Sequence, residues 1–335
     1  MNIGILGAGT WGVALAALFC KNGHRVTVWS ALAEEIDELA KTHRHKNLPL
    51  VALPPEIVYT KDLKAACTEK ETVIFAVPSA FFRQTAHRAT PFLAQGAVAV
   101  SVAKGLEKNT LLTMTDILED EFSGMGRKDL HAMALSGPTH AEEVAMDVPT
   151  SIVAACKDER IAAFVADAFK GSCVRVYTNT DVVGVEICGA MKNIIALAAG
   201  ICGGMGLGDN TKAMLITRGA HEICRVGLAM GGSMHTFMGL AGFGDLIVTC
   251  ISKHSRNNRC GEYIGGGMSY EEASARIGMV VEGYVALDAA MELSAKYAVE
   301  MPITEAVYDI IHRGVTPGEV MTRLMQREMK SEKNW

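Results

Sequence analysis

Residues 2–12 read Asn-Ile-Gly-Ile-Leu-Gly-Ala-Gly-Thr-Trp-Gly, and this stretch determines the fold class. Asn2–Leu6 has the apolar character of a short buried strand, and a helical pattern follows at once. The glycines follow the spacing G-x-G-x-x-G. The first permits a tight turn, the second lets backbone approach a pyrophosphate, and the third lets helix and strand pack closely. Because a helix N-terminus attracts phosphate, the stretch predicts a dinucleotide site on Gly7, Gly9 and Gly12.

Strand and helix patterns alternate through the first half of the chain. Most strand candidates are continuously apolar, as expected where helices cover both faces of a sheet. The first helix, Gly12–Lys21, is predicted to stop at Asn22-Gly23, because glycine adopts the left-handed conformation after a helix at little cost. The alternation predicts a mostly parallel, Rossmann-type doubly wound α/β sheet. The candidates are Asn2–Leu6, Arg25–Trp29, Thr72–Val77, Ala97–Val102, Ala132–Leu135, Ser151–Ala155 and Val174–Tyr177.

The second half changes character near Thr180-Asp181. From there on the patterns are helical, with glycine-rich turns between them. Ser269–Glu272 and Thr316–Glu319 each fit a capping box, the second with proline at the first helical position. A chain of 335 residues also exceeds the usual size of one hydrophobic core. We therefore expect a dinucleotide-binding α/β domain over residues 1–180 and an all-helical substrate and catalytic domain over residues 181–335.

Composition restricts the class of partner. The hydrophobic fraction is 49%, the charged fraction 21% and the formal net charge -5, as in an ordinary globular protein. This balance argues against a broad nucleic-acid surface, which needs a basic stripe. It leaves room for a phosphorylated metabolite, because one local pocket of Arg and Lys is sufficient.

The sequence also predicts a cytoplasmic, soluble protein. Its nine cysteines are scattered and form no C-x-x-C pair, which is typical of reduced thiols rather than disulfides or zinc ligands. A strand begins within a few residues of Met1, leaving no room for a signal peptide. The apolar stretch from Val182 to Met205 contains Glu186 and Lys192, so a buried helix is favoured over a membrane span.

The residues at the end of the second strand leave the preference between NAD and NADP open. An acid there would hold the ribose 2′-hydroxyl of NAD, and a nearby arginine would accommodate the 2′-phosphate of NADP. The residues present are Trp29-Ser30-Ala31, which supply neither. Glu34 and Glu35 follow, and we expect both to be solvated on a helix face.

Lys192 is the most unusual charged residue. It lies in an otherwise apolar, small-residue helical pattern, and its helical neighbours Cys188, Gly189, Ile195 and Ala196 are all uncharged. Such a lysine must reach solvent, find a partner or lose its proton. It is either a snorkelling lysine or a general acid and base, and the pattern alone leaves both open.

Two segments after strands are further candidates. Lys104 follows the strand 97–102, at the edge where ligands bind open α/β sheets. Gly137 and Thr139 follow the strand 132–135, and Thr139 with Glu142 fits a capping box. Each could equally be an ordinary loop or capping residue.

Two polar sites interrupt the helical half. Asp245 follows a glycine-rich apolar run, where it either caps a helix or pairs with a buried lysine. Arg256, in Ser255–Arg259, precedes a helical pattern and could grip a phosphate, with helix-start amides as further donors. No Ser-His-Asp grouping or metal-ligand spacing competes, so no metal is predicted.

Together these motifs resemble the bacterial branch of the NAD(P)-dependent glycerol-3-phosphate dehydrogenase family, from Gly4 to about Arg327. The resemblance is specific because the matches are many and ordered. They are Gly7–Gly12, Asn47-Leu48-Pro49, 76–79, 104–107, 136–139, 191–193, 242–246, 255–257, 281–284 and 301–303.

The resemblance implies a mechanism and a set of site residues. Lys192 is then the proton donor to the carbonyl of dihydroxyacetone phosphate, with Asp245 and Lys104 in the reactive pocket between two domains. The implied cofactor is NAD or NADP, bound by Gly7, Gly9, Thr10, Trp11, Gly12, Lys104, Ala141, Arg256, Val280 and Glu282. The implied substrate residues are Lys104, Gly137, Thr139, Lys192, Asn193, Asp245, Thr249, Ser255, Arg256 and Asn257.

Family members often carry a basic residue near position 31, from which Ala31 departs. The resemblance also implies a homodimer and a role in phospholipid synthesis. Two rival functions stay open: a reductase of a β-hydroxyacid or sugar acid, which needs no phosphate anchor at Arg256, and a nucleotide-binding sensor without turnover.

Overall fold

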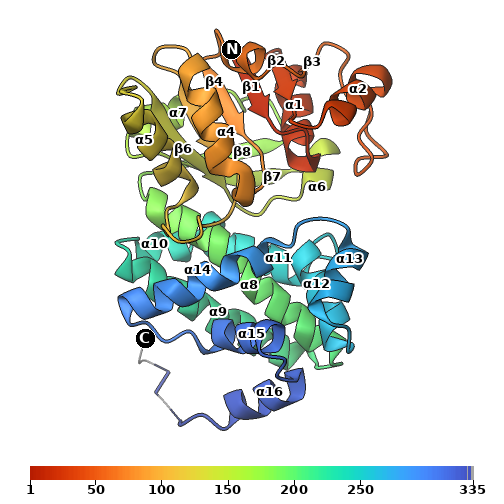
Figure 1. Ribbon diagram of the computed structural model, residues 1–335, viewed down its shortest axis with the longest axis vertical. Helices are drawn as coiled ribbons and strands as arrows, with labels where there is room; N and C mark the ends of the chain where they lie inside the picture. Colours follow the sequence, from red (N-terminus) through yellow and green to blue (C-terminus); the bar gives the residue numbers. More distant parts are fainter. Residues whose placement is uncertain (330, 333–335) are drawn as a thin grey trace. The chain divides into compact units, whose positions relative to one another are not determined.

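A computed structural model describes residues 1–329, 331 and 332 of the chain. It forms two compact units, coloured in sequence order in Figure 1. The first, the sheet unit, comprises Met1–Lys104 and Leu112–Val182. The second, the helical unit, comprises Gly105–Leu111 and the chain from Val183 onward. The short segment Gly105–Leu111 thus belongs with residues far along the chain, which no local pattern indicates.

The sheet unit is built on one eight-stranded sheet of order β3-β2-β1-β4-β5-β6-β7-β8. All neighbouring strands are parallel except β6 and β7, which are antiparallel. The predicted strands all form, within one to two residues at their ends. The additional strand, β3, has three residues, too few for a periodic signal. The strands are β1 Asn2–Leu6, β2 Arg25–Trp29, β3 Val58–Thr60, β4 Thr72–Phe75, β5 Val98–Ser101, β6 His131–Ser136, β7 Thr150–Ala155 and β8 Val174–Asn179.

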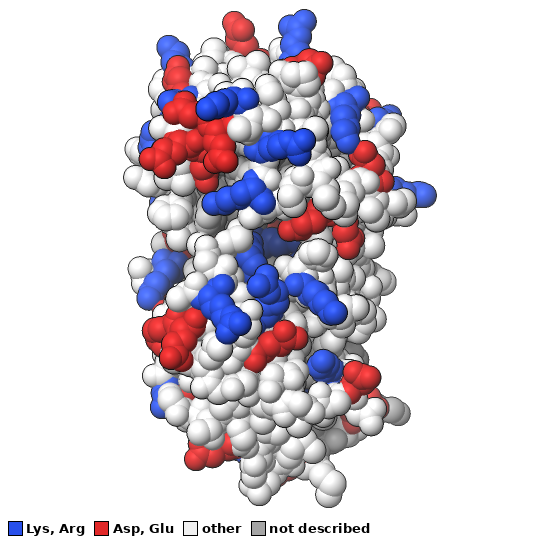
Figure 2. Space-filling model, turned by 90° about the vertical axis from the view of Figure 1, so that its right-hand side faces the viewer, with Lys and Arg blue, Asp and Glu red and all other residues white. Residues whose placement is uncertain are grey.

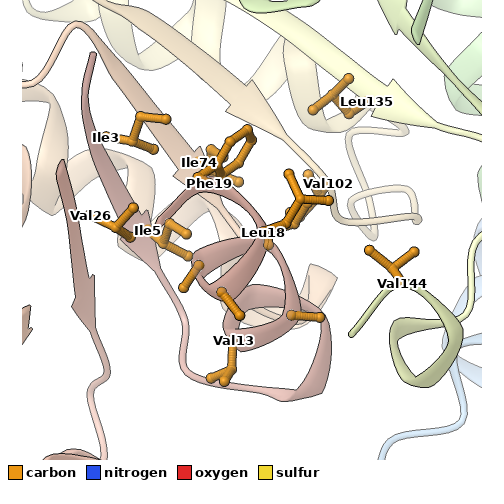
Figure 3. Packing of buried hydrophobic residues seen from close by; sticks show 14 of the residues in the cluster. Ile3, Ile5, Val13, Leu18, Phe19, Val26, Ile74, Val102, Leu135 and Val144 are labelled. Atoms are coloured by element: carbon orange, nitrogen blue, oxygen red, sulfur yellow. The ribbon is translucent and has the colours of Figure 1, made fainter. Parts of the chain in front are cut away.

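Helix α1 (Thr10–Lys21) packs its apolar side chains against the sheet. Figure 3 shows Val13 and Phe19 of this helix among strand residues such as Ile5 and Ile74. It begins two residues before the predicted Gly12 and is capped at Asn22, as expected. The other helices of the unit are α2 Ala33–Thr42, α3 Leu63–Cys67, α4 Phe82–Ala89, α5 Met114–Gly124, α6 Ala141–Ala145 and α7 Glu159–Asp167, with 3-10 turns at Ser79–Phe81 and Thr90–Phe92.

The helical unit is organised around α8 (Val182–Gly204), whose most apolar window is 94% buried. The prediction of a buried core helix here is confirmed. Met234–Ile251 is also long and apolar enough to cross a membrane, but it is 44% buried and contains the buried polar residues Asp245 and Thr249. The remaining elements are α9 Asp209–Ala229, α10 Met234–Phe237, the π-helix η3 Leu240–Gly244, α11 Asp245–Ile251, α12 Arg256–Gly265, α13 Tyr270–Ile277, α14 Glu282–Tyr297, α15 Pro302–His312 and α16 Pro317–Met325.

Glycines let α8 and α12 approach at backbone distance. A Cβ on Gly200 would lie 1.9 Å from the carbonyl oxygen of Asn258, and one on Gly261 would lie 2.1 Å from that of Leu197. Any larger residue at either position would push the helices apart. The contact places the first turns of α12 against the second half of α8.

Side-chain capping follows the sequence in the helical unit. Ser269 and Thr316 form the predicted capping boxes, the latter with Pro317 in the first turn.

All nine cysteines are free thiols. Figure 2 shows one face, on which a group of Lys and Arg side chains lie next to one another, while elsewhere Lys and Arg are mixed with Asp and Glu.

Candidate active site

Lys192 is buried, with 6% of its surface exposed, and its amino group does not snorkel to solvent. Its Nζ donates to the carboxylate of Asp245, which is fully buried, and to Thr249 Oγ1 at 2.7 Å. The Thr249 hydroxyl in turn donates to the Asp245 carbonyl oxygen at 2.6 Å. A buried ion pair is stable only when further hydrogen bonds support it, and here both partners are so supported. Of the two alternatives for Asp245, pairing with a buried lysine is the one observed.

The glycine-rich run before Asp245 brings this carboxylate to the lysine. A Cβ on Gly242 would lie 2.1 Å from the Phe237 carbonyl oxygen, so this tight turn requires glycine. Asp245 then opens α11, and Thr249 follows one turn later on the same face. Cys250 also faces the pair, and burial raises the pKa of its thiol to about 12. It is therefore a neutral neighbour rather than a thiolate.

Asn193 and Asn257 form a buried amide bridge. Asn257 Nδ2 donates to Asn193 Oδ1 at 3.0 Å, and Asn257 Oδ1 accepts the backbone N–H of Gly283 at 2.8 Å. A Cβ on Gly283 would lie 2.5 Å from the Asn193 carbonyl oxygen, so the motif Val281-Glu282-Gly283 requires its glycine. These two amides, which the resemblance also assigns to the substrate, join α8, α12 and the start of α14.

The start of α12 is formed as expected. Ser255 is the N-cap, and its side chain accepts the Asn258 N–H. The Arg256 guanidinium donates to the Val280 carbonyl oxygen at 3.1 Å. Arg256 and the segment Val280–Glu282, predicted for the nucleotide site, therefore lie together. A helix start with an arginine beside it is suited to a phosphate.

In the sheet unit the glycine-rich turn has the shape a dinucleotide requires. Gly7 has φ +122°, and a Cβ there would lie 2.6 Å from the Ala76 carbonyl oxygen. A Cβ on Gly12 would lie 2.2 Å from the Gly7 carbonyl oxygen, whereas the space beside Gly9 is open. Thr10 and Trp11 follow in the first turn of α1. Backbone N–H groups at an open helix start fit the pyrophosphate of NAD or NADP.

Lys104 and Gly137 meet at the carboxyl ends of neighbouring strands. Lys104 Nζ donates to the Gly137 carbonyl oxygen at 3.2 Å, and the Thr139 hydroxyl donates to the same oxygen at 3.1 Å. The predicted capping box of Thr139 with Glu142 is wrong. The N-cap of α6 is His140, without a side-chain cap, and Ala141 is its first residue. The Thr139 hydroxyl turns back to Gly137, because the positive-φ turn at Gly137 brings that carbonyl within reach.

The expectation that Glu35 is merely solvated is also wrong. Ser30 Oγ donates to Glu35 Oε2 at 2.8 Å and accepts the Leu32 N–H at 3.1 Å. A carboxylate therefore lies beside the end of β2, although none follows it directly in sequence. A serine ahead of a helix with an acid in its first turn is the signal that could have indicated this. Ala31 itself is exposed.

The structure thus groups the predicted residues into four sets, two in each unit. Within the described residues, no three His, Cys, Asp or Glu side chains gather as metal ligands. The sets are Lys192, Asp245 and Thr249; Asn193, Asn257 and Gly283, with Ser255, Arg256, Val280 and Glu282; Gly7, Gly9, Thr10, Trp11 and Gly12; and Lys104, Gly137, Thr139 and Ala141.

Comparison with known proteins gives the family. The model for the N-terminus of NAD-dependent glycerol-3-phosphate dehydrogenase matches residues 2–162, and the model for its C-terminus matches residues 181–322. An NAD(P)+ glycerol-3-phosphate dehydrogenase of Lactobacillus delbrueckii is 55% identical over 99% of this chain and 98% of the relative. One of Bacillus subtilis is 47% identical over 97% of this chain and 94% of the relative.

Solved structures agree with the family found by sequence comparison. The glycerol-3-phosphate dehydrogenase of Coxiella burnetii superposes with a TM-score of 0.92 at 35% identity, covering 97% of this chain and 99% of the other. A ketopantoate reductase of Ralstonia eutropha superposes with a TM-score of 0.62 at 16% identity, which shows a shared fold alone.

Fold, glycine-rich turn and buried lysine define a dinucleotide-dependent oxidoreductase. The family matches narrow this class. The chain belongs to the NAD(P)-dependent glycerol-3-phosphate dehydrogenase family.

Proposed function

We propose that the protein catalyses the reversible NAD(P)-dependent reduction of dihydroxyacetone phosphate to sn-glycerol 3-phosphate. The observation that carries the proposal is the buried Lys192 amino group, held by Asp245 and Thr249 in a chain of this family. An apolar interior tolerates a lysine only if it is paired, and a sequestered ammonium is a suitable proton donor.

Lys192 supplies the proton of the reaction. The nicotinamide, when bound, supplies the hydride that reaches the C2 carbon. The Lys192 ammonium donates a proton to the carbonyl oxygen as negative charge develops there, and in the oxidation the neutral amine accepts it back. Asp245 orients the ammonium and stabilises its charge, while Thr249 fixes the direction of a second N–H. Burial excludes water that would otherwise compete for this proton.

Phosphate recognition is assigned to the start of α12. Arg256 can neutralise the phosphate, and the first N–H groups of the helix add donors. Arg256 presently donates to the Val280 carbonyl oxygen, so binding of the substrate exchanges a neutral acceptor for a charged one. In the sheet unit, Lys104, Gly137 and Thr139 are the further candidates for substrate contact.

The remaining features of the proposal rest on the family. They are a nucleotide-binding domain over residues 1–180, a catalytic domain over residues 181–335, a cytoplasmic homodimer and a supply of glycerol 3-phosphate to phospholipid synthesis. The proposal includes both NADH and NADPH.

Oxidation of NADH and NADPH, followed by absorbance, tests the reaction with dihydroxyacetone phosphate and with unphosphorylated dihydroxyacetone. We expect rapid oxidation with the phosphate ester alone, and the ratio of the two cofactors gives the preference. No oxidation by folded protein that binds NADH would refute the substrate assignment.

Arg256→Ala tests the phosphate anchor, with Arg259→Ala on the exposed side of the same helix as control. We expect Arg256→Ala to lower kcat/KM for dihydroxyacetone phosphate about 10- to 100-fold, the loss expected for one charge-assisted hydrogen-bonding group. An equal effect of the two substitutions would contradict the anchor.

A further inference from the structure

The segment that follows α2 folds back onto the glycine-rich turn. His43 ends α2 in the left-handed conformation, with φ 48°, and its carbonyl oxygen accepts the Leu53 N–H at 2.9 Å. Leu48 is buried in the same apolar cluster as α1. The segment is therefore anchored at both ends, and the motif Asn47-Leu48-Pro49, which the site described above does not use, lies within it.

His45 supports Asn47 within this segment. Its ring is buried, and Nδ1 accepts the Asn47 backbone N–H at 3.2 Å. Because Nδ1 is the acceptor, the neutral ring carries its hydrogen on Nε2. The bond fixes the backbone of Asn47, whose side chain reaches the glycine-rich turn.

The surroundings of His45 keep its ring neutral. Burial lowers the pKa of the imidazole, Lys46 adds to the lowering, and Glu35 and Glu38 of α2 oppose it. Only a neutral ring can accept the Asn47 N–H at Nδ1.

Asn47 reaches the first residue of α1. Its Nδ2 donates to Thr10 Oγ1 at 3.0 Å. Since the amide donates, the Thr10 hydroxyl uses a lone pair in this bond, and its own hydrogen points elsewhere. Thr10 is at the helix start, where a hydroxyl donor adds to the backbone N–H groups that attract phosphate.

We propose that His45 and Asn47 are positioning residues of the dinucleotide site. Through Thr10, Asn47 directs a hydroxyl hydrogen toward the pyrophosphate, and His45 holds the backbone of Asn47 in place for this contact. This inference rests on the proposed function only in taking NAD(P) as the ligand. It does not depend on the identity of the second substrate.

Titration of NADH fluorescence in the absence of a second substrate tests the role of Asn47. We expect Asn47→Ala to raise the Kd of NADH about five- to tenfold, as for loss of one hydrogen bond. Leu50→Ala, in the same segment and 83% exposed, is the control and should leave the Kd unchanged. A lower Tm with an unaltered Kd would show that Asn47 is structural only and would overturn the proposal.

A double-mutant cycle tests the route through Thr10. If Asn47 acts on the cofactor through the Thr10 hydroxyl, Thr10→Val and Asn47→Ala together should weaken NADH binding no more than Thr10→Val alone. Fully additive losses would overturn that route.

Two substitutions of His45 test its role in positioning. His45→Leu removes the hydrogen bond to the Asn47 N–H, whereas the side-chain carbonyl oxygen of His45→Gln can still accept it. We expect Gln to restore most of the NADH affinity that Leu loses, and equal weakening by both would contradict the assignment. Because every measurement is of NADH binding, a protein inactive on dihydroxyacetone phosphate would refute the proposed reaction while leaving these outcomes readable.

Discussion

Lys192 Nζ donates a hydrogen bond to the Asp245 carboxylate, although the two residues lie 53 positions apart. Both are buried within the helical unit. Truncating one partner of such a pair leaves a buried charge uncompensated and costs about 3–5 kcal/mol of stability. Tests of catalysis at this pair therefore need a parallel measurement of folding.

Lys192→Met should remove the proton donor. We expect kcat to fall by about 10²- to 10⁴-fold, the usual contribution of a general acid, while NADH binding persists. Turnover, NADH titration and circular dichroism of the same preparation separate lost chemistry from lost fold. Near-normal turnover by the variant would show that the proton comes from another group.

Thr249→Val should disturb the direction of the lysine without changing its charge. The valine keeps the shape of threonine but cannot accept the Lys192 N–H that Thr249 Oγ1 accepts at 2.7 Å. We expect kcat to fall about tenfold, as for one hydrogen bond, with little change in KM. Thr249→Ser, which keeps the hydroxyl, should recover most of the activity. If serine and valine gave the same kcat, the hydroxyl would have no positioning role.

Gly200→Ala should separate α8 from α12, because its Cβ would lie 1.9 Å from the Asn258 carbonyl oxygen. Overpacking of this kind destabilises by about 1–3 kcal/mol, and here it also displaces the start of α12. We expect a lower Tm and a higher KM for dihydroxyacetone phosphate. Gly203→Ala is the matched control on the same helix, since its nearest contact is 3.6 Å to the Glu262 side chain. Equal effects of the two alanines would argue against the close approach.

Glu222 makes the free energy of unfolding depend on pH. This residue of α9 is 1% exposed, and its carboxylate accepts the backbone N–H groups of Ile303 and Thr304 at the start of α15. Burial raises the pKa of its carboxyl from 4.5 to about 7, against the effect of these donors.

Between those pKa values the native state binds more protons than the unfolded state, so the free energy of unfolding falls as pH rises. The contribution is complete below the unfolded pKa and is lost above about pH 7, with a size on the order of 3 kcal/mol. Denaturant unfolding of the native protein and Glu222→Gln at several pH values measures it. Between about pH 5 and pH 8, the free energy of unfolding of the native protein should fall relative to that of Glu222→Gln. A constant difference between the two free energies would mean that Glu222 stays ionised in the native state.

The sequence by itself determined the fold class and singled out Lys192 as an unusual charged residue. Runs such as Asn2–Leu6, the spacing of Gly7, Gly9 and Gly12, and the helical periodicity around Lys192 are local patterns, and local backbone preferences produce them. A lysine surrounded by apolar residues was unusual before any contact was known, because burial of an unpaired charge is so costly.

Only the tertiary structure decided which side chains meet. The pairing of Lys192 with Asp245 and Thr249, and of Asn193 with Asn257, depends on helices brought together by glycines such as Gly200. Tertiary folding also decided three other contacts that the sequence did not predict. They are the bond of Thr139 to Gly137 in place of a capping box, the contact between Ser30 and Glu35, and the bond from Asn47 to Thr10. A side chain with several partners within reach takes the one that folding places in the right geometry, and sequence spacing does not encode that choice.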